Sequence, residues 1–283
     1  PLVSGDCMEA KPQIPRTPSP PDPIRPQASE TVSRLRAEIA FHEAQAAARR
    51  RYFTEHPEEL LVQDDAYLDH ESWVRFAFDL LGDVSGKAVL DYGCGHGMAA
   101  VILARRGAQV TAFDLCGGYV AEAQQRAEAN AVADRIDFVQ AAGERLPFRD
   151  GSFDAVWGHA VLHHLDLEPA CRELVRVLKP GGTAVFCEPW GGNPLLEWAR
   201  RRCRYPGKER TRDERPLQPN DLAEVRRHFR ETCLYPQQLL GMLGRIWPRL
   251  PCRKFLHRCD QSLLTWFPSL GRFSRYLVLS LRN

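Results

Sequence analysis

The alternation of short apolar runs with helical patterns between residues 88 and 187 constrains the fold of this chain more than any other feature. Apolar runs of four to six residues are typical of buried strands. We predict strands at 88–91, 109–114, 136–140, 153–158 and 183–187, and helices at 98–106, 120–130 and 169–178. Strands and helices that alternate at this spacing predict a parallel sheet with helices on both faces.

Two later apolar stretches, at 231–240 and 276–281, can supply the last strands. The sequence therefore predicts an α/β fold with a doubly wound, mostly parallel seven-stranded sheet of the Rossmann-like kind. A chain of 283 residues suits one large domain with appendages, or two small domains.

Two helical patterns precede the sheet and predict an N-terminal helical cap. The first begins near Ser29 or Thr31, either of which can cap it, and ends at about Phe53. The second covers 72–81, and residues 11–26 contain seven prolines that predict an extended or disordered tail. The expected organisation is a tail at 1–28, a cap at 29–84 and a main domain at 85–283, with a basic insertion at about 190–230.

The turns after the first two predicted strands carry the strongest chemical signal. Residues 91–97 read DYGCGHG, in which Gly93 and Gly95 let the backbone approach a ligand closely. Asp91 would repel a pyrophosphate but attract the amino group of an amino acid. Asp114 ends the second strand, where a carboxylate accepts hydrogen bonds from ribose hydroxyls.

The residues considered so far are compatible with two classes of cofactor-binding protein. Gly95, Gly97 and Ala100 satisfy the dinucleotide fingerprint, so a nicotinamide-dependent oxidoreductase is one alternative, although Asp91 disfavours it. A non-catalytic cofactor-binding module is the other, although both acidic residues of a binding site are present. An RNA methyltransferase is disfavoured because the formal net charge is only +2 and no RNA-binding motif is added.

Five segments, taken in order, resemble the successive motifs of class I S-adenosylmethionine-dependent methyltransferases. They are VLDYGCGHG at 89–97, Asp114, ERLPF at 144–148, SFDAV at 152–156 and LKPGG at 178–182. The resemblance implies an enzyme that uses S-adenosyl-L-methionine and transfers its methyl group to an oxygen, nitrogen or carbon atom of a small molecule.

The resemblance also implies a set of cofactor-binding residues. It assigns Asp91, Gly93 and Gly95 to the methionine end of the cofactor, Asp114 to the ribose and Leu115 to the adenine. Members of the family often have an acidic residue for the adenine amino group, but this chain reads QAAG at 140–143. Backbone groups near Gly143, or Glu144, are then expected to contact the adenine.

Three histidines follow the fourth predicted strand, and His159 stands where the family commonly places residues that face the transferred methyl group. A histidine suits the role of general base, so His159 and His163 are the predicted catalytic residues. In a helix that began here, His159 and His163 would share one face at i and i+4. Such a pair can also bind a metal, but no third ligand is evident, and no metal is predicted.

The walls of the acceptor pocket must come from outside the matched motifs. We predict that Tyr52, at the end of the first cap helix, contacts the acceptor, and that Trp190, after the fifth strand, offers it a flat apolar face. The alternative is that Trp190 is only a core residue. The basic segment at 200–215 can close over an acidic group of the acceptor, or it is only a solvated surface. Residues 239–267 can cover the substrate or touch lipid at a membrane surface.

The remaining sequence signals concern the surroundings of the protein. No apolar run reaches the length of a transmembrane helix, and no signal peptide is visible, so we expect a cytoplasmic protein. The nine cysteines form no C-x-x-C pair and are expected to be reduced thiols. The sequence gives no reason to expect nucleic acid as a partner, and it does not indicate an oligomeric state.

Overall fold

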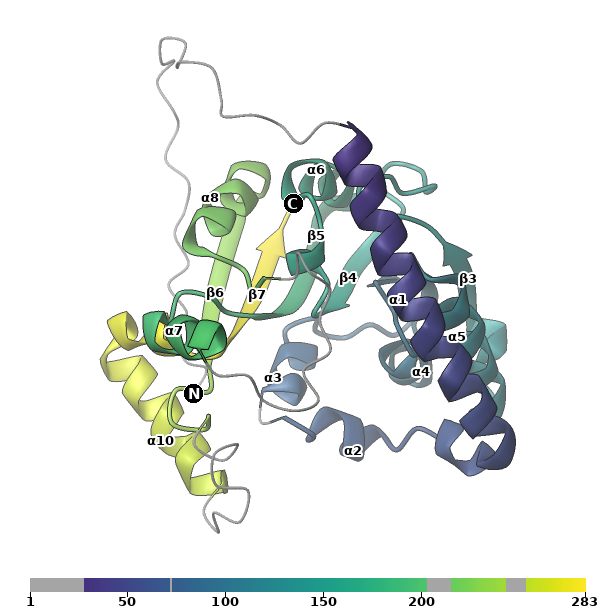
Figure 1. Cartoon of the computed structure of the whole chain (residues 1–283), viewed down its shortest axis with the longest axis horizontal. Helices are drawn as coiled ribbons and strands as arrows, with labels where there is room; N and C mark the ends of the chain where they lie inside the picture. Colours follow the sequence, from purple (N-terminus) through teal and green to yellow (C-terminus); the bar gives the residue numbers. More distant parts are fainter. Residues whose placement is uncertain (1–27, 72, 203–214, 243–252) are drawn as a thin grey trace.

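The computed structural model describes residues 28–71, 73–202, 215–242 and 253–283, and its centre is one seven-stranded sheet (Figure 1). The strand order is β3-β2-β1-β4-β5-β7-β6, and only β7 runs antiparallel to its neighbours β5 and β6. The bounds are β1 (Ala88–Tyr92), β2 (Gln109–Asp114), β3 (Ile136–Gln140), β4 (Phe153–His159), β5 (Leu178–Pro189), β6 (Glu231–Gln237) and β7 (Tyr276–Arg282). The predicted fold class is confirmed.

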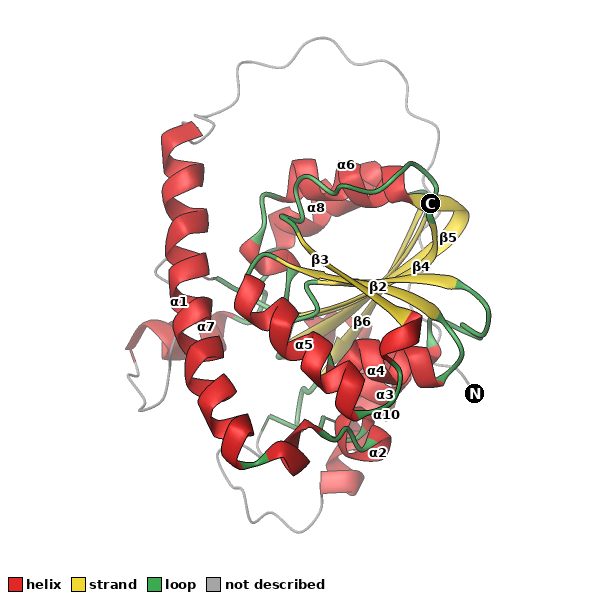
Figure 2. Cartoon of the chain, turned by 90° about the vertical axis from the view of Figure 1, so that its right-hand side faces the viewer, coloured by secondary structure: helices red, strands yellow, loops and turns green. Residues whose placement is uncertain are grey.

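Helices cover the two faces of the sheet, and each face has its own hydrophobic core (Figure 2). The helices α3 (Val74–Asp79), α4 (Met98–Arg105) and α5 (Gly117–Ala129) lie on one face. On the other face, α6 (Leu167–Val177) and α8 (Pro219–His228) pack together. In α6 the buried residues recur with helical spacing, at Ala170, Cys171, Leu174 and Val177, which explains why its period is visible in the sequence.

The segment in front of the sheet contains more elements than the sequence predicts. The first cap helix is confirmed as α1 (Ala28–Glu55), but η1 (Pro57–Leu60) and α2 (Asp64–Leu68) follow it, and the second cap helix is only the six-residue α3. Such short elements are fixed by contacts with distant residues: the Asn130 side chain accepts a hydrogen bond from the Val62 amide (2.9 Å) and donates one to the Leu60 carbonyl (2.9 Å). The predicted proline-rich tail lies outside the described residues, except for its last residue, which begins α1.

The fifth strand also differs from its prediction. The sequence predicts a helix that ends at 178 and a strand that begins at 183, but residues 178–182 belong to β5. This strand pairs Leu178 with Phe153 and then Thr183 with Ala155. A local irregularity in the register between Phe153 and Ala155 accommodates the additional residues.

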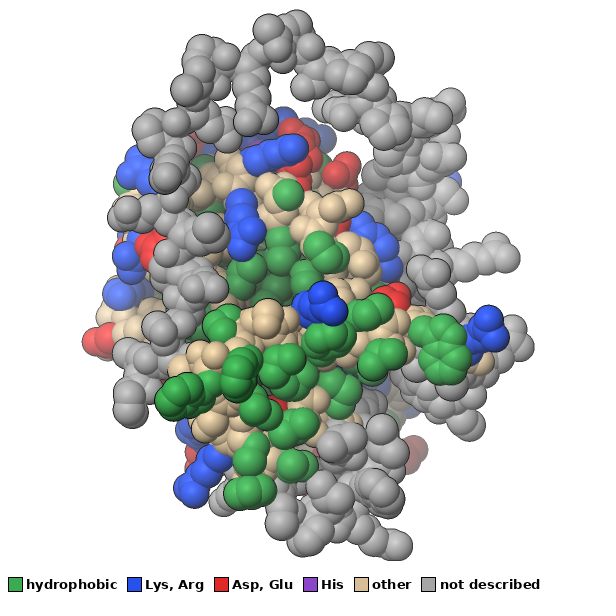
Figure 3. Space-filling view, turned by 90° about the vertical axis from the view of Figure 1, so that its left-hand side faces the viewer, with side chains coloured by type: hydrophobic (Ala, Val, Ile, Leu, Met, Phe, Trp, Pro, Cys, Tyr) green, Lys and Arg blue, Asp and Glu red, His purple; other side chains and the backbone are tan. Residues whose placement is uncertain are grey.

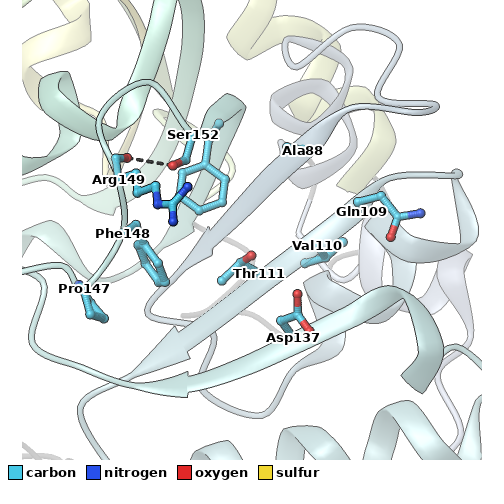
Figure 4. A pocket seen from close by; sticks show the side chains of 10 residues that line it. Ala88, Gln109, Val110, Thr111, Asp137, Pro147, Phe148, Arg149 and Ser152 are labelled. Carbon is cyan, nitrogen blue, oxygen red and sulfur yellow. Dashed lines mark hydrogen bonds between the residues drawn. The ribbon is translucent and has the colours of Figure 1, made fainter.

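The connection from β3 to β4, residues 141–152, contains no helix. A cavity of about 430 Å³ opens beneath it and is lined by the first residues of β1, β2 and β4 and by Phe148 and Arg149 of the connection (Figure 4). This cavity lies at the amino ends of the strands, and ligands of open α/β sheets bind at the carboxyl ends. We therefore place the functional site at the opposite edge.

The rest of the described chain consists of α7 (Pro194–Arg202), α10 (Arg253–Trp266) and the short helices η2 (Ala133–Arg135), η3 (Leu162–His164) and η4 (Pro268–Phe273). Within the described residues, no helix has the length and apolar character needed to cross a membrane. Most of the basic segment at 200–215 lies outside the described residues. The expectation of reduced thiols is corrected at Cys233, which is disulfide-bonded, whereas Cys94, Cys116, Cys171, Cys187 and Cys259 are free.

Candidate active site

The glycine loop between β1 and α4 forms the floor of the candidate site. Gly93 has a φ of +69°, and a Cβ atom there would lie 2.5 Å from the Val161 side chain, so only glycine fits. Gly95 also has a positive φ, but no atom lies within 4 Å of the place that its Cβ would take. The loop is thus held tightly on one side and open at Gly95, where a ligand can approach the backbone.

Asp91 lies beside this loop with only 2% of its surface exposed. Its Oδ2 atom is buried and has no hydrogen-bond partner. Desolvation, together with the neighbouring Asp114 carboxylate, raises the pKa of Asp91 to about 7. A buried acceptor without a partner is costly, so an ammonium group bound here would both satisfy the oxygen and stabilise its charge.

Asp114 ties the glycine loop to β2. Its Oδ2 atom accepts a hydrogen bond from the Gly95 amide (2.9 Å), and its Oδ1 atom accepts one from the Cys116 amide (2.9 Å). Burial raises the pKa of Asp114, and these two amides oppose that effect. Each carboxylate oxygen can accept a second hydrogen bond, so the predicted contact with ribose hydroxyls remains chemically available.

Helix α1 packs against α5 and reaches over this edge of the sheet, which the sequence did not predict. The Oε1 atom of Glu43 accepts a hydrogen bond from the Gly118 amide (2.8 Å) at the start of α5. His42 lies within hydrogen-bonding distance of the Tyr119 hydroxyl (3.2 Å), and its ring is 6.3 Å from that of His164, in η3. Helix α1 therefore connects the loop after β2 with the loop after β4.

An ion pair between the partly exposed Arg49 and the buried Glu122 fastens α1 in this position. The Arg49 guanidinium donates hydrogen bonds to both carboxylate oxygens of Glu122 (2.8 Å from Nη2 to Oε1 and 3.1 Å from Nε to Oε2). Glu122 is 3% exposed and also accepts a hydrogen bond from the buried Arg126 (3.0 Å). Glu122 and Arg126 are four residues apart on one helix, but nothing in the sequence links them to Arg49.

The residues predicted for adenine lie at the carboxyl ends of β2 and β3. Leu115 is half-buried, and its carbonyl accepts a hydrogen bond from Gln140 (3.0 Å). The carbonyl of Gly143 accepts one from the Tyr92 hydroxyl (2.8 Å), and a Cβ atom on Gly143 would lie 2.3 Å from that hydroxyl oxygen. Glu144 accepts a hydrogen bond from the Asp166 amide (3.2 Å). Contacts of Leu115, Gly143 and Glu144 with adenine stay predictions.

His159 ends β4 at the same edge as the glycine loop. No helix begins at His159, so His159 and His163 do not share a helical face: Ala160 takes a left-handed conformation (φ +56°), which changes the chain direction before η3. Burial, with a contribution from nearby His70, lowers the pKa of His159 to about 4. His159 is therefore neutral at pH 7, but it is a weaker base than an ordinary histidine.

His163 has a different environment. Its Nδ1 atom is 2.6 Å from the Oε2 atom of Glu188, which is fully buried. The other oxygen of Glu188 accepts hydrogen bonds from the amides of Val161 (2.9 Å) and Leu162 (2.8 Å). This arrangement makes His163 part of the support that fixes the loop after β4, and its direct role in catalysis stays a prediction.

Aromatic rings surround His159, and we call Tyr67, His70, Trp73, Trp157 and His159 together the His159 cluster. Ring centroids are separated by 5.4 Å from Trp73 to His159, by 6.0 Å from His70 to His159 and by 6.5 Å from Trp157 to His159. Tyr67 packs on His70 at 5.5 Å. The indole nitrogen of Trp73 is buried without a hydrogen-bond partner, and the rings of Trp73 and Trp157 are both fully buried.

The structure does not bring the two predicted acceptor-binding residues together with this cluster. Tyr52 is 47% exposed on α1, and its ring packs on Phe53 and His56. Trp190 is only 7% exposed and belongs to the core on the α6 face, so it does not offer the open flat surface that was predicted. Trp190 follows β5 because its ring packs into this core. Among the described residues, no group of three His, Cys, Asp or Glu side chains could hold a metal ion.

Comparison with known proteins gives a consistent result for the centre of the chain. Residues 90–186 match the family model described as a methyltransferase domain. Over 107 residues the chain is 41% identical to a demethylmenaquinone methyltransferase of Clavibacter sepedonicus, a match that covers 37% of this chain and 42% of that protein. Over 121 residues it is 39% identical to a sterol 24-C-methyltransferase of Gibberella zeae, covering 42% of this chain and 31% of that protein. The chain thus spans less than half the length of these relatives.

The fold has counterparts among solved structures. The geranyl diphosphate C-methyltransferase of Streptomyces coelicolor, solved with S-adenosyl-L-homocysteine, is similar with a TM-score of 0.50 and 20% sequence identity. The alignment covers 74% of this chain and 77% of that chain. At this level of identity the likeness concerns the fold alone.

Proposed function

We propose that this chain, which belongs to the class I S-adenosylmethionine-dependent methyltransferases, transfers the methyl group of that cofactor to a small, largely apolar molecule. The observation that carries the proposal is the buried Oδ2 atom of Asp91, which has no partner and lies beside the open glycine loop. An α-ammonium group is the ligand that such an oxygen requires. A pyrophosphate placed there would meet a carboxylate instead, which argues against a nicotinamide cofactor.

The residues of the site fit the cofactor as follows. Asp91 would hold the ammonium group and the loop at Gly93 and Gly95 would accommodate the methionine end, as the family resemblance implies. Asp114 would accept hydrogen bonds from the ribose, while its bonds to the Gly95 and Cys116 amides keep it in place. Glu43 of α1 lies over the start of α5, next to Asp114, and would cover the nucleoside from the solvent side.

The acceptor would lie against the His159 cluster. Three of its members, Tyr67, His70 and Trp73, precede residues 90–186 in the chain, so they are outside the part that matches the family model. Trp73 and Trp157 are fully buried, so the rings of Tyr67, His70 and His159 would face the acceptor, and they favour a largely apolar molecule. Two relatives are named for apolar acceptors, demethylmenaquinone and a sterol, which supports an acceptor of this chemistry. The name of the sterol 24-C-methyltransferase also supports a carbon atom as the methylated position.

The reaction is an in-line displacement, for which the cofactor supplies an activated methyl group on a sulfonium. The protein then contributes mainly by orientation and by excluding water. The neutral imidazole of His159 would accept a hydrogen bond from a hydroxyl group of the acceptor and so align it. Glu188 and His163 would keep His159 in position, because they fix the loop that begins directly after it. Because the pKa of His159 is lowered, His159 is a weak base, and it would contribute to the rate more by aligning the acceptor than by removing its proton.

Calorimetry tests the cofactor assignment directly. We expect S-adenosyl-L-homocysteine to bind and NAD not to bind. The replacement Asp91→Ala should weaken the binding of S-adenosyl-L-homocysteine by about 1–3 kcal/mol, because the ammonium group of the ligand would be buried without a partner. The matched control is Asp137→Ala, which removes an exposed carboxylate from β3. Tight NAD binding, or equal affinity of the two variants, would refute the assignment.

The acceptor assignment needs a separate measurement. Candidate quinols, sterols and prenyl compounds are incubated with the protein and the labelled cofactor, and products are identified by mass spectrometry. For an active acceptor, His70→Ala removes an exposed ring of the cluster, so KM should rise about 2–10-fold while cofactor affinity holds. An unchanged KM in this variant would show that the His70 ring does not contact the acceptor.

A further inference from the structure

The face of the molecule that carries α7 and α10 exposes an unusual amount of apolar side chain (Figure 3). Seven large hydrophobic residues are exposed among the described residues, and five of them belong to this face. They are Leu195, Trp198, Phe255, Trp266 and Phe267, each 58–78% exposed, and we call them the α7–α10 surface. Exposed aromatic residues gathered in one place mark an interaction site more often than isolated ones do.

Positive charge accompanies these side chains. The helices α7 and α10 contain six Lys or Arg residues against two acidic residues, Glu197 and Asp260. Asp260 is 3% exposed and accepts hydrogen bonds from the amides of Leu240 (2.5 Å) and Gly241 (3.0 Å), so its charge is directed inward. Arg202 and Arg258 are exposed on the two helices. By sequence, the two helices that carry the α7–α10 surface are therefore basic, and among the described side chains Arg202 and Arg258 accompany the exposed rings.

The surface is connected to the acceptor side of the active site. Helix α7 begins shortly after β5, the strand that holds Glu188, and the Asn193 side chain before it donates a hydrogen bond to the Phe273 carbonyl (2.5 Å). Phe273 ends η4, which leads into β7, and the first residue of β7, Tyr276, packs on Trp73 with a ring distance of 4.8 Å. Trp73 in turn contacts His159.

We propose that the α7–α10 surface docks on a lipid bilayer that contains anionic headgroups. Tryptophan and phenylalanine side chains insert into the boundary between headgroups and acyl chains, while neighbouring arginines pair with phosphates. The combination of exposed rings with an excess of positive charge favours a lipid surface over a second copy of this chain, because two copies would bring like charges together. The proposal concerns binding alone and does not depend on methyl transfer.

Vesicle flotation with the full chain and no cofactor tests the proposal. Wild-type protein should float with vesicles of phosphatidylglycerol and phosphatidylcholine, less with phosphatidylcholine alone, and less at high salt. The variant Trp198→Ser/Trp266→Ser/Phe267→Ser should lower the partition coefficient about tenfold or more. The matched control, Tyr52→Ser/Leu61→Ser, removes two exposed apolar side chains from elsewhere on the molecule and should bind as the wild type does.

A second variant guards against misfolding of the first. Arg202→Glu/Arg258→Glu changes only exposed side chains. It should abolish the preference for anionic vesicles and leave the affinity for S-adenosyl-L-homocysteine unchanged. Absence of wild-type binding, or an equal loss in the control, would overturn the proposal. So would a wild-type dimer in sedimentation velocity that the triple variant dissociates, because a second copy would then occupy the surface. Failure of methyl transfer with intact vesicle binding would count only against the proposed function.

Discussion

The pKa of Asp91 makes the affinity for the cofactor depend on pH. Raising this pKa from 3.8 to about 7 corresponds to roughly 4 kcal/mol of preference for the neutral carboxyl group in the free protein. An ammonium group requires the ionised form, so binding must release the proton that Asp91 holds. At pH 6 about one molecule in ten is ionised, and the dissociation constant of S-adenosyl-L-homocysteine should be about tenfold larger there than at pH 8.

Titration calorimetry in buffers with different ionisation enthalpies measures this linkage. Binding should release about one proton per site at pH 6 and about a tenth of a proton at pH 8. Asp91→Asn should bind weakly and lose most of the pH dependence, whereas Asp137→Asn should behave as the wild type. A dissociation constant that is the same at both pH values, without proton release, would refute the reasoning from desolvation.

The same shift has a consequence for the stability of the free protein. Because the folded state binds the Asp91 proton more tightly than the unfolded state, this residue lowers the free energy of unfolding as pH rises from about 4 to about 7. Asp91→Asn removes the cost of a buried charge, so at pH 8 the variant should melt at a higher temperature than the wild type in the absence of cofactor.

Three further variants probe other parts of the site. His159→Ala should lower kcat about 10–100-fold with unchanged cofactor affinity. With saturating cofactor, the wild-type acid limb of kcat/KM for the acceptor should fall near pH 4, since the neutral imidazole persists down to its lowered pKa. A limb near pH 6.5 that the substitution removes would contradict this. Arg49→Ala should lower the free energy of unfolding by only about 1 kcal/mol, because Arg49 is partly exposed. It should also make α1 more susceptible to proteases, and unchanged cleavage of α1 would show that the pair with Glu122 does not fasten the helix. Gly143→Ala should destabilise the fold by about 1–3 kcal/mol because of its contact with Tyr92, and Tyr92→Phe in the same chain should recover part of the loss of melting temperature.

The sheet could be predicted because its information is local. Strands buried on both faces are continuous apolar runs, and the helices between them show their own period, as the burial of Ala170, Leu174 and Val177 illustrates. The glycine loop was visible for the same reason, since Asp91, Gly93 and Gly95 lie within five residues. The error at His159 and His163 came from a single left-handed residue, Ala160, and from the buried carboxylate of Glu188 that accepts two amides of the next turn.

The parts of the site that were missed come from long-range packing. Glu43 is 75 residues from Gly118, and the rings of the His159 cluster are contributed by α2, by the connection between α2 and α3, and by β4. Tyr67 lies in a five-residue helix whose sequence, DDAYL, has no period that would reveal it. Trp190 shows the converse: a tryptophan in a glycine-rich stretch after a strand looks like a binding residue, but its burial shows that it packs in the core.

The position of α1 has a kinetic consequence. Since Glu43 binds the start of α5 and His42 approaches both Tyr119 and His164, a nucleoside cannot reach Asp114 from this side without displacing part of the helix. Association would then occur in two steps, undocking of α1 followed by capture. In stopped-flow experiments the observed rate should level off at high ligand concentration, and breaking the Arg49–Glu122 pair should raise that limiting rate. The same helix would set the rate at which the spent cofactor leaves after each turnover.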